Sequence, residues 1–354
     1  MAPKTRITLK DVAQRCGYSV NTVSRALRGD EHLPQDTKER IQNAAMEVGY
    51  IKNTLASSLR SGRSHVIAII IEELQNQHYS ALLNLLSLYL ARQGYRVMIL
   101  TNRRDTVEKA SSASALPLAV SYAISHGVDG VFFFPERTDQ AAAIALRANH
   151  IPLVLIDREI EGMDLSIVRV DDYDGGRLAA KLLLERNHRD ILYLCGPEGN
   201  GSQPLREQGF LDTLKERGIN RSSIRRISHE DFLRAIEEDT LESLILPIDY
   251  TAVFSFNDQL AYYLMGCLQG NGYQIPGDIS VLGFDNIRAS FPYMPALSTI
   301  GIAHQNDLAL NAVSLMCERI ENPDQEPEKI ILPVRYVEGG TLSVCGEGRN
   351  PHHL

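Results

Sequence analysis

Residues 8–27 read TLKDVAQRCGYSVNTVSRAL, which is the pattern of two short helices joined by a tight turn. The apolar residues of the first helix recur at helical spacing and form one face: Leu9, Val12, Ala13 and Cys16. Gly17 supplies the permissive backbone that ends this helix, and the second helix has its own apolar residues at Val23, Ala26 and Leu27. The spacing predicts a helix-turn-helix whose second helix reads DNA.

Polar side chains dominate the exposed face of the second helix. Thr8 can cap the first helix, and Ser19 can cap the second. The exposed positions that follow are Val20, Asn21, Thr22, Ser24 and Arg25. These side-chain types suit base edges and phosphates. Two amphipathic surface helices around a glycine turn would show the same spacing, so the spacing alone leaves both interpretations open.

Charge is unevenly distributed along the chain. The 354 residues carry a net charge of −8, which by itself argues against nucleic acid. Residues 1–63, however, contain 11 Lys and Arg against 6 Asp and Glu, so this end is +5 and the remainder is −13. A small basic module on a large acidic body favours a nucleic-acid-binding head on a body that has another task.

Cysteine spacing and hydropathy exclude several classes. The five cysteines are scattered, and no pair has metal-ligand spacing, so we expect reduced thiols, no metal and a cytoplasmic protein. The N-terminus has no apolar signal core, and apolar runs such as 66–71 are too short to span a bilayer. Residues 196–201, GPEGNG, lack the Lys-Ser/Thr of a phosphate-binding loop and are interpreted as a plain turn. We predict no cofactor and no membrane partner.

A third helix is expected at about 35–48, and it completes a head of residues 1–49. Residues 50–63 include a segment that is too short to be helical alone in water. This segment is either a flexible linker or a hinge that folds only on DNA and on its copy in a dimer.

Strands and helices alternate through residues 64–345. Strands are expected at 66–71, 96–101, 130–134, 152–156, 166–170, 191–195, 252–256, 279–284 and 330–334. Helices are expected at 79–93, 106–126 with a break at Pro117, 139–149, 174–186, 204–217, 231–238, 258–270 and 307–321. The alternation predicts an α/β body of two doubly wound parallel-sheet lobes, with a ligand in the crevice between them. We divide it into an N-lobe of 64–163 and 294–324, a C-lobe of 164–293 and 325–345, and a tail of 346–354.

Several segments resemble the LacI/GalR family of bacterial transcription regulators. In the head these are ITLKDVA at 7–13, SVNTVSRAL at 19–27 and LASSL at 55–59. In the body they are LIDR at 155–158, Gly196-Pro197, FND at 256–258 and ISVLGFD at 279–285. The likeness extends from about residue 7 to 342. It implies a body like that of periplasmic sugar-binding proteins, and a homodimer because the tail is too short and polar for a tetramerising helix.

The resemblance also implies how the head would meet a near-palindromic operator. Val20, Asn21 and Arg25 would read bases in the major groove. Thr8, Ser19, Thr22, Ser24 and His32 would contact phosphates or position the head. In the hinge, Leu59 would wedge into the central minor groove, with Ala56 beside it and Arg60 flanking it. Pro34 departs from the Ser or Thr that the family often has there, so one phosphate contact would be lost.

For the crevice, the resemblance implies a small-molecule effector clamped by Arg206. The further candidates, taken from strand ends and family positions, are Glu72, His78, Tyr79, Arg158, Asp171, Asn257 and Asp285. Such a set suits a sugar better than an apolar ligand, and a purine or nucleoside is the alternative. The implied function is a repressor, associated with the bacterial nucleoid, whose operator affinity is set by this ligand. A sugar-binding transport protein and an enzyme on the same lobed fold are the rival interpretations, but the chain shows neither an export signal nor a catalytic constellation.

Overall fold

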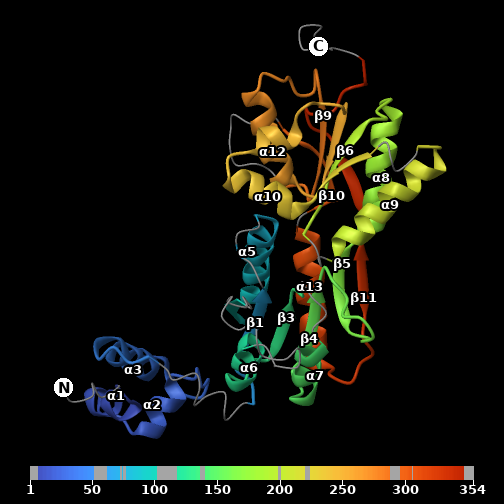
Figure 1. The fold of residues 1–354 in the computed structure, drawn as a ribbon. Coiled ribbons are helices and arrows are strands. Elements are labelled where there is room, and N and C mark those ends of the chain that lie inside the picture. The colour runs from blue at the N-terminus through green and yellow to red at the C-terminus, as the bar shows by residue number, and fades with distance from the viewer. Residues whose placement is uncertain are drawn as a thin grey trace. The chain divides into compact units, whose positions relative to one another are not determined.

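The computed structural model describes residues 7–51, 62–71, 74, 77–101, 118–135, 140–197, 201–219, 224–287, 296–304 and 306–346. The chain divides into two compact units, Met1–Ser64 and His65–Leu354 (Figure 1). Each unit has its own hydrophobic core, so each is described by itself.

The first unit is a three-helix head. It consists of α1 (Leu9–Cys16), α2 (Val20–Ala26) and α3 (Gln35–Glu47). Gly17 ends α1 with a backbone φ of +76°, which is a left-handed conformation that glycine adopts without strain. Val12, Val23 and Ile41, one from each helix, are fully buried together at the centre. The predicted helix-turn-helix is thus confirmed, and so is the third helix.

Within the described residues, the second unit contains two six-stranded sheets. The first sheet runs in the order β11 (Lys329–Leu332), β5 (Ser166–Val170), β4 (Leu153–Ile156), β3 (Gly130–Phe133), β1 (Val66–Ile71) and β2 (Arg96–Thr101). The second runs in the order β12 (Val334–Val337), β10 (Ser298–Ile302), β9 (Ser280–Phe284), β8 (Ala252–Ser255), β6 (Ile191–Leu194) and β7 (Ile224–Ile227). Strands such as VIAIII in β1 are apolar throughout because helices cover both faces of a parallel sheet.

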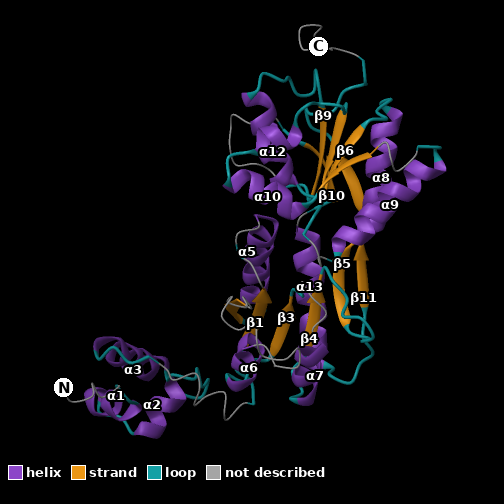
Figure 2. Cartoon of the chain, in the orientation of Figure 1, coloured by secondary structure: helices purple, strands orange, loops and turns teal. Residues whose placement is uncertain are grey.

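Helices pack on both faces of each sheet (Figure 2). On the first sheet, α5 (Gln77–Arg92) and α13 (Asn306–Glu321) cover one face, while α6 (Leu118–Ser125) and α7 (Gln140–Ala148) cover the other. On the second, α8 (Asp172–Glu185) and α9 (Ser202–Glu216) cover one face, while α10 (His229–Glu237), α11 (Leu241–Ile245) and α12 (Asp258–Gly270) cover the other. The two doubly wound lobes are therefore present as predicted.

The lobe boundaries differ from the prediction. β5 and β11 belong to the first sheet, although their residues were assigned to the C-lobe. β10 belongs to the second sheet, although its residues were assigned to the N-lobe. β5 extends the first sheet beyond its fourth strand by pairing in parallel with β4, and β10 extends the second sheet in the same way by pairing with β9. Local alternation of strands and helices does not reveal which sheet a strand will join.

Several short elements were not predicted. They are β7, α11, β10 and β12, and the last pairs antiparallel with β10, so the second sheet is not wholly parallel. The predicted helical stretch from 106 to 117 lies outside the described residues. Among the described helices, none has both the length and the apolar character that crossing a membrane requires.

Candidate functional site

The exposed face of α2 is the first candidate site. Ser19 caps this helix by accepting a hydrogen bond from the Thr22 backbone N–H at 3.1 Å, and its hydroxyl lies 2.9 Å from that of Thr22. Val20 is 41% exposed and Asn21 is also exposed. The structure thus leaves the predicted base-reading residues accessible on one short helix.

Other predicted contacts of the head have local partners as well. Thr8 caps α1, and its backbone N–H and its hydroxyl both donate to the Asp11 carboxylate at 2.7 Å. Ser24 is half-buried and His32 is exposed in the loop before α3. Arg25 forms an ion pair with Asp30, a residue that the sequence analysis did not single out, at 2.7 Å.

Four predicted site residues cannot be placed, because they lie outside the described residues. They are Ala56, Leu59, Arg60 and Glu72.

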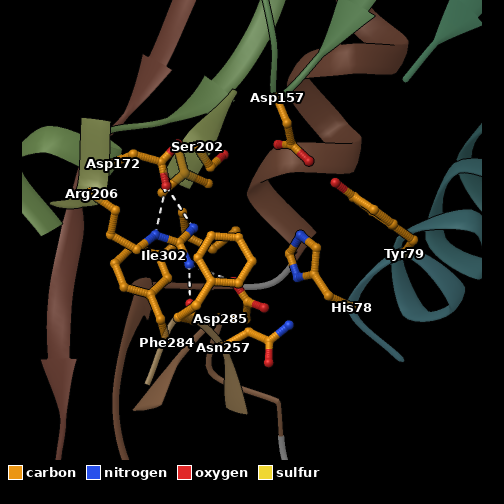
Figure 3. A pocket seen from close by; sticks show the side chains of 13 residues that line it. His78, Tyr79, Asp157, Asp172, Ser202, Arg206, Asn257, Phe284, Asp285 and Ile302 are labelled. Carbon is orange, nitrogen blue, oxygen red and sulfur yellow. Dashed lines mark hydrogen bonds and ion pairs between the residues drawn. The ribbon is translucent and has the colours of Figure 1, made fainter. Parts of the chain in front are cut away.

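The second candidate site is a cavity where the carboxyl ends of strands from both sheets meet (Figure 3). Its volume is about 40 Å³, so a sugar could enter only if its walls move. The cavity is lined by His78, Tyr79, Asp157, Val170, Asp172, Ser202, Arg206, Phe256, Asn257, Phe284, Asp285, Gly301 and Ile302. Parallel strands of a doubly wound sheet collect loop and helix-start residues at this edge, which explains why polar groups gather there.

Arg206 lies at the centre of one wall of the cavity and is only 4% exposed. Its Nε and Nη2 atoms donate to Oδ1 of Asp172 at 3.1 and 2.6 Å, and Nη1 donates to the Phe256 carbonyl. The guanidinium carbon also lies 3.4 Å from the centre of the Phe284 ring and 4.5 Å from that of Phe256. Stacking and ion pairing together fix the plane of this guanidinium.

Charge balance at the cavity favours the ionised Arg206. Burial works against the charged form, but Asp172 and Asp285 outweigh it and raise the pKa of Arg206. Oδ1 of Asp285 is 3.9 Å from Nη1 of Arg206. The described lining residues thus include three carboxylates, two of which lie near the single guanidinium, and the His78 ring.

Burial raises the pKa values of two carboxyl groups in the cavity, those of Asp157 and Asp285. Burial raises the pKa of Asp157 to about 6; His78 opposes the shift, whereas Asp172 and Asp285 increase it. Burial raises the pKa of Asp285 as well, against the effects of His78 and Arg206. Both residues also have left-handed backbones, with φ of +66° and +105°. Strained backbone of this kind persists where the surrounding structure holds it, and it is common at ligand sites.

The remaining polar groups come from the starts of helices. Asn257 caps α12 by accepting from the Leu260 N–H at 2.9 Å, and its amide nitrogen points toward His78 in Figure 3. His78 and Tyr79 lie in the first turn of α5, with ring centres 5.5 Å apart. Ser202 begins α9, one turn before Arg206. The cavity therefore combines hydrogen-bond donors, acceptors and aromatic rings.

The cavity brings together five of the predicted effector residues, namely His78, Tyr79, Arg206, Asn257 and Asp285. Arg158 lies beside it, in a smaller adjoining cavity shared with Tyr79 and Gly201. The prediction for Asp171 needs correction, because its side chain accepts from the Asp174 N–H at 3.0 Å and caps α8 instead of lining the cavity. The next residue, Asp172, is the one that meets Arg206.

Asp157 belongs to the LIDR segment that resembles the family, where it forms a ligand-side pair with the predicted Arg158. Sequence reasoning missed the other cavity residues, which are Val170, Asp172, Ser202, Phe256, Phe284, Gly301 and Ile302. A signal existed for Asp172, because it opens a helix two residues after a buried strand. The two phenylalanines looked like ordinary strand residues.

A head with an exposed DNA-reading helix, joined to a two-sheet body with a polar cavity, defines a class: DNA-binding regulators with a ligand-binding body. Comparison with known proteins agrees. Residues 8–53 match the family model of bacterial regulatory proteins of the lacI family, and residues 180–342 match that of the periplasmic binding protein-like domain. The chain thus contains a DNA-binding domain of the lacI family and a periplasmic binding protein-like domain, and it is a DNA-binding transcriptional regulator.

Similar proteins cover nearly the whole chain. HTH-type transcriptional repressor PurR of Pasteurella multocida is 28% identical over 330 residues, which are 90% of this chain and 93% of that protein. HTH-type transcriptional repressor CytR of Escherichia coli is 28% identical over 298 residues, covering 84% and 85%. The crystal structure of the Lac repressor dimer bound to operator and the anti-inducer ONPF matches with a TM-score of 0.77 at 25% identity, covering 96% of this chain and 100% of that one.

Proposed function

We propose that the chain acts in the bacterial cytoplasm, on nucleoid DNA, as a homodimeric repressor whose operator affinity is set by a sugar bound in the cavity around Arg206. In this proposal residues 1–49 bind the operator and 50–63 form the hinge. The body, residues 64–345, binds the effector and dimerises, and 346–354 are a tail. The cavity has a binding role and no catalytic one. Support comes from relatives that are named as repressors and from a similar structure that is a dimer on its operator.

The proposal of a neutral sugar, as opposed to an anionic ligand, rests on the pairing of Arg206 with Asp172. A guanidinium that is already neutralised by a carboxylate at 2.6 Å cannot act as an uncompensated anion clamp. Asp157 and Asp285 add further negative charge, which repels phosphates and sugar acids. Carboxylates, an amide and an arginine side by side are instead able to accept and donate hydrogen bonds to the vicinal hydroxyls of a neutral sugar.

A nucleoside is the second candidate. Its ribose offers the same hydroxyls, and the Tyr79 ring at the cavity wall could pack against a base. The faces of Phe256 and Phe284 that meet Arg206 are already occupied, which leaves fewer aromatic surfaces for a base than a purely stacking site would need.

Thermal-shift measurements on the full chain test this proposal. Neutral aldoses, nucleosides, sugar phosphates and sugar acids are screened, and a neutral sugar is expected to raise the melting temperature because it binds only the folded state. Arg206→Ala should abolish the shift, whereas Asp171→Asn, which removes a charge from a neighbouring residue outside the cavity, should retain it. Stabilisation by anionic compounds alone would contradict the proposal.

A further inference from the structure

The loop that follows α2 contains an acidic residue in an unusual place. Asp30 lies five residues after Arg25, between the reading helix and α3. Nε of Arg25 donates to Oδ2 of Asp30 at 2.7 Å, and the two side chains are 42% and 23% exposed. An acid beside a DNA-binding surface repels phosphates, so its presence there needs a reason.

Backbone groups hold Asp30 in place. Its Oδ1 accepts from the His32 N–H at 3.0 Å, and its own N–H donates to the Arg25 carbonyl at 3.2 Å. The hydrogen bond from Arg25, followed by that from His32, lowers the pKa of Asp30, so the carboxylate stays charged at neutral pH. Asp30 is therefore a fixed anchor for the longer and more flexible Arg25.

The pairing occupies only one nitrogen of Arg25. Within the part of the chain that the structure describes, neither Nη1 nor Nη2 of Arg25 has a hydrogen-bond partner. These terminal nitrogens can make a bidentate contact with the edge of a guanine. The anchor thus constrains the side chain while it leaves the donors for base reading available.

We infer that Asp30 is a positioning residue that holds Arg25 in the orientation for base reading, so that it increases discrimination between operator sequences and lowers affinity for all DNA. This inference rests on the proposed role of Arg25 as a base reader. An arginine that is ordered before binding loses less rotamer freedom when it meets the correct base. A charge-only role would instead change affinity equally for every sequence.

Selection from a library of random duplex DNA tests this inference. The full chain, Arg25→Ala, Asp30→Asn and Glu31→Gln each bind the library, and the bound duplexes are sequenced. Asp30 accepts from Arg25 and from His32 through its two different oxygens, and Asp30→Asn replaces one of these oxygens with an NH2 group that can only donate. Glu31→Gln is the matched control, because it removes the same charge from the neighbouring exposed position.

Arg25→Ala should lose the base preference at one position of each half-site. Asp30→Asn should weaken the preference at that same position by about fivefold or more, which is the scale of one good base contact. Both Asp30→Asn and Glu31→Gln should bind a duplex of scrambled sequence more tightly, but Glu31→Gln should keep the base preference.

Two results would overturn the inference, and they are distinguishable. If Arg25→Ala loses the preference while Asp30→Asn keeps it, the positioning role of Asp30 is wrong and base reading by Arg25 stands. If Arg25→Ala affects no single position, base reading by Arg25 is itself wrong. Asp30→Ser guards against misfolding, because serine can still cap the turn at His32 but is too short to reach Arg25. It should show the same loss of preference and a normal thermal unfolding transition.

Discussion

At the scale of single residues, Arg206 and Asp172 form the buried ion pair on which the cavity depends. The two side chains are 5% and 2% exposed, so neither charge is compensated by water. A buried pair adds little net stability compared with apolar residues, but removal of one partner leaves the other charge unpaired. The pair therefore has a larger effect on the orientation of Arg206 than on the stability of the fold.

Asp172→Ala should lower the free energy of unfolding of the body by about 3 kcal/mol or more, because it leaves a buried guanidinium without its partner. Denaturant titration measures this change. The double variant Asp172→Ala with Arg206→Met should recover much of the loss, since no unpaired charge remains. Equal destabilisation by the single and double variants would contradict this interpretation.

Asp157 should make the stability of the body depend on pH. Its pKa in the folded protein is raised from 3.8 to about 6, so between these values the folded state holds a proton that the unfolded state has lost. The cost of ionising this group is thus absent below pH 3.8, grows as pH rises toward 6 and is complete above it. Asp157→Asn removes the cost and should stabilise the body at pH 7 by about 1–3 kcal/mol.

Denaturant titrations at pH 7 and pH 4.5 check this expectation. The difference in the free energy of unfolding between Asp157→Asn and the parent chain should be smaller at pH 4.5 than at pH 7. A gap of the same size at both values would show that the carboxyl of Asp157 does not titrate in this window.

Single residues of the cavity were predictable only in part from the sequence. Arg206 was predicted from the family resemblance, whereas Asn257 and Asp285 stood out because they are polar groups just beyond the ends of buried strands. The choice between Asp171 and Asp172 could not be made, because it depends on which of two adjacent carboxylates caps α8 and which faces α9. The answer depends on the residue at which α8 begins, and the spacing of apolar residues does not locate a helix start to within one residue.

At the scale of elements, the contact between α8 and α9 places the ion pair. A Cβ atom on Gly176 would lie 2.0 Å from the Arg206 carbonyl oxygen, and one on Gly209 would lie 2.0 Å from that of Tyr173. Only glycine lets the two backbones approach this closely. α8 begins with Asp172 and α9 carries Arg206, so the close packing sets the geometry of the cavity wall.

Gly209→Ala should destabilise the body by about 1–3 kcal/mol and weaken ligand binding, because α9 must move away from α8. Thermal unfolding and ligand-induced shifts measure the two effects. Gly266→Ala is the matched control in α12, where an added Cβ meets nothing within 4 Å. It should stabilise the protein by about 0.5–1 kcal/mol through helix propensity. Similar effects of both substitutions would rule out the proposed close contact.

Whether a helix or strand could be predicted from the sequence depended on its length. Long amphipathic helices and buried apolar strands such as β1 were predicted well, because their period extends over several turns or repeats. β7, with the sequence IRRI, carries two arginines in four residues and gave no strand signal. The membership of β5, β10 and β11 in their sheets depends on pairing between distant segments, which local patterns do not encode.

At the scale of the whole molecule, the two sheets repeat one strand order. In each, the first strand lies between the second and third, and the fourth and fifth follow outward. The cavity lies at the carboxyl ends of both sheets, so a ligand there contacts both lobes at once. We expect such a ligand to favour one arrangement of the lobes over another, by no more than its difference in affinity for the two.

The binding of operator DNA with and without the cavity ligand tests this coupling most directly. The full chain is titrated against the operator selected from the random library, in the presence and absence of the stabilising sugar, with fluorescence anisotropy as the signal. The dissociation constant for the operator should change by about tenfold or more. A change of this size corresponds to a typical coupling free energy between two sites. Arg206→Ala should bind the operator but show no change on addition of the sugar. An identical operator affinity of the parent chain with and without a ligand that demonstrably occupies the cavity would contradict control of the head by the body.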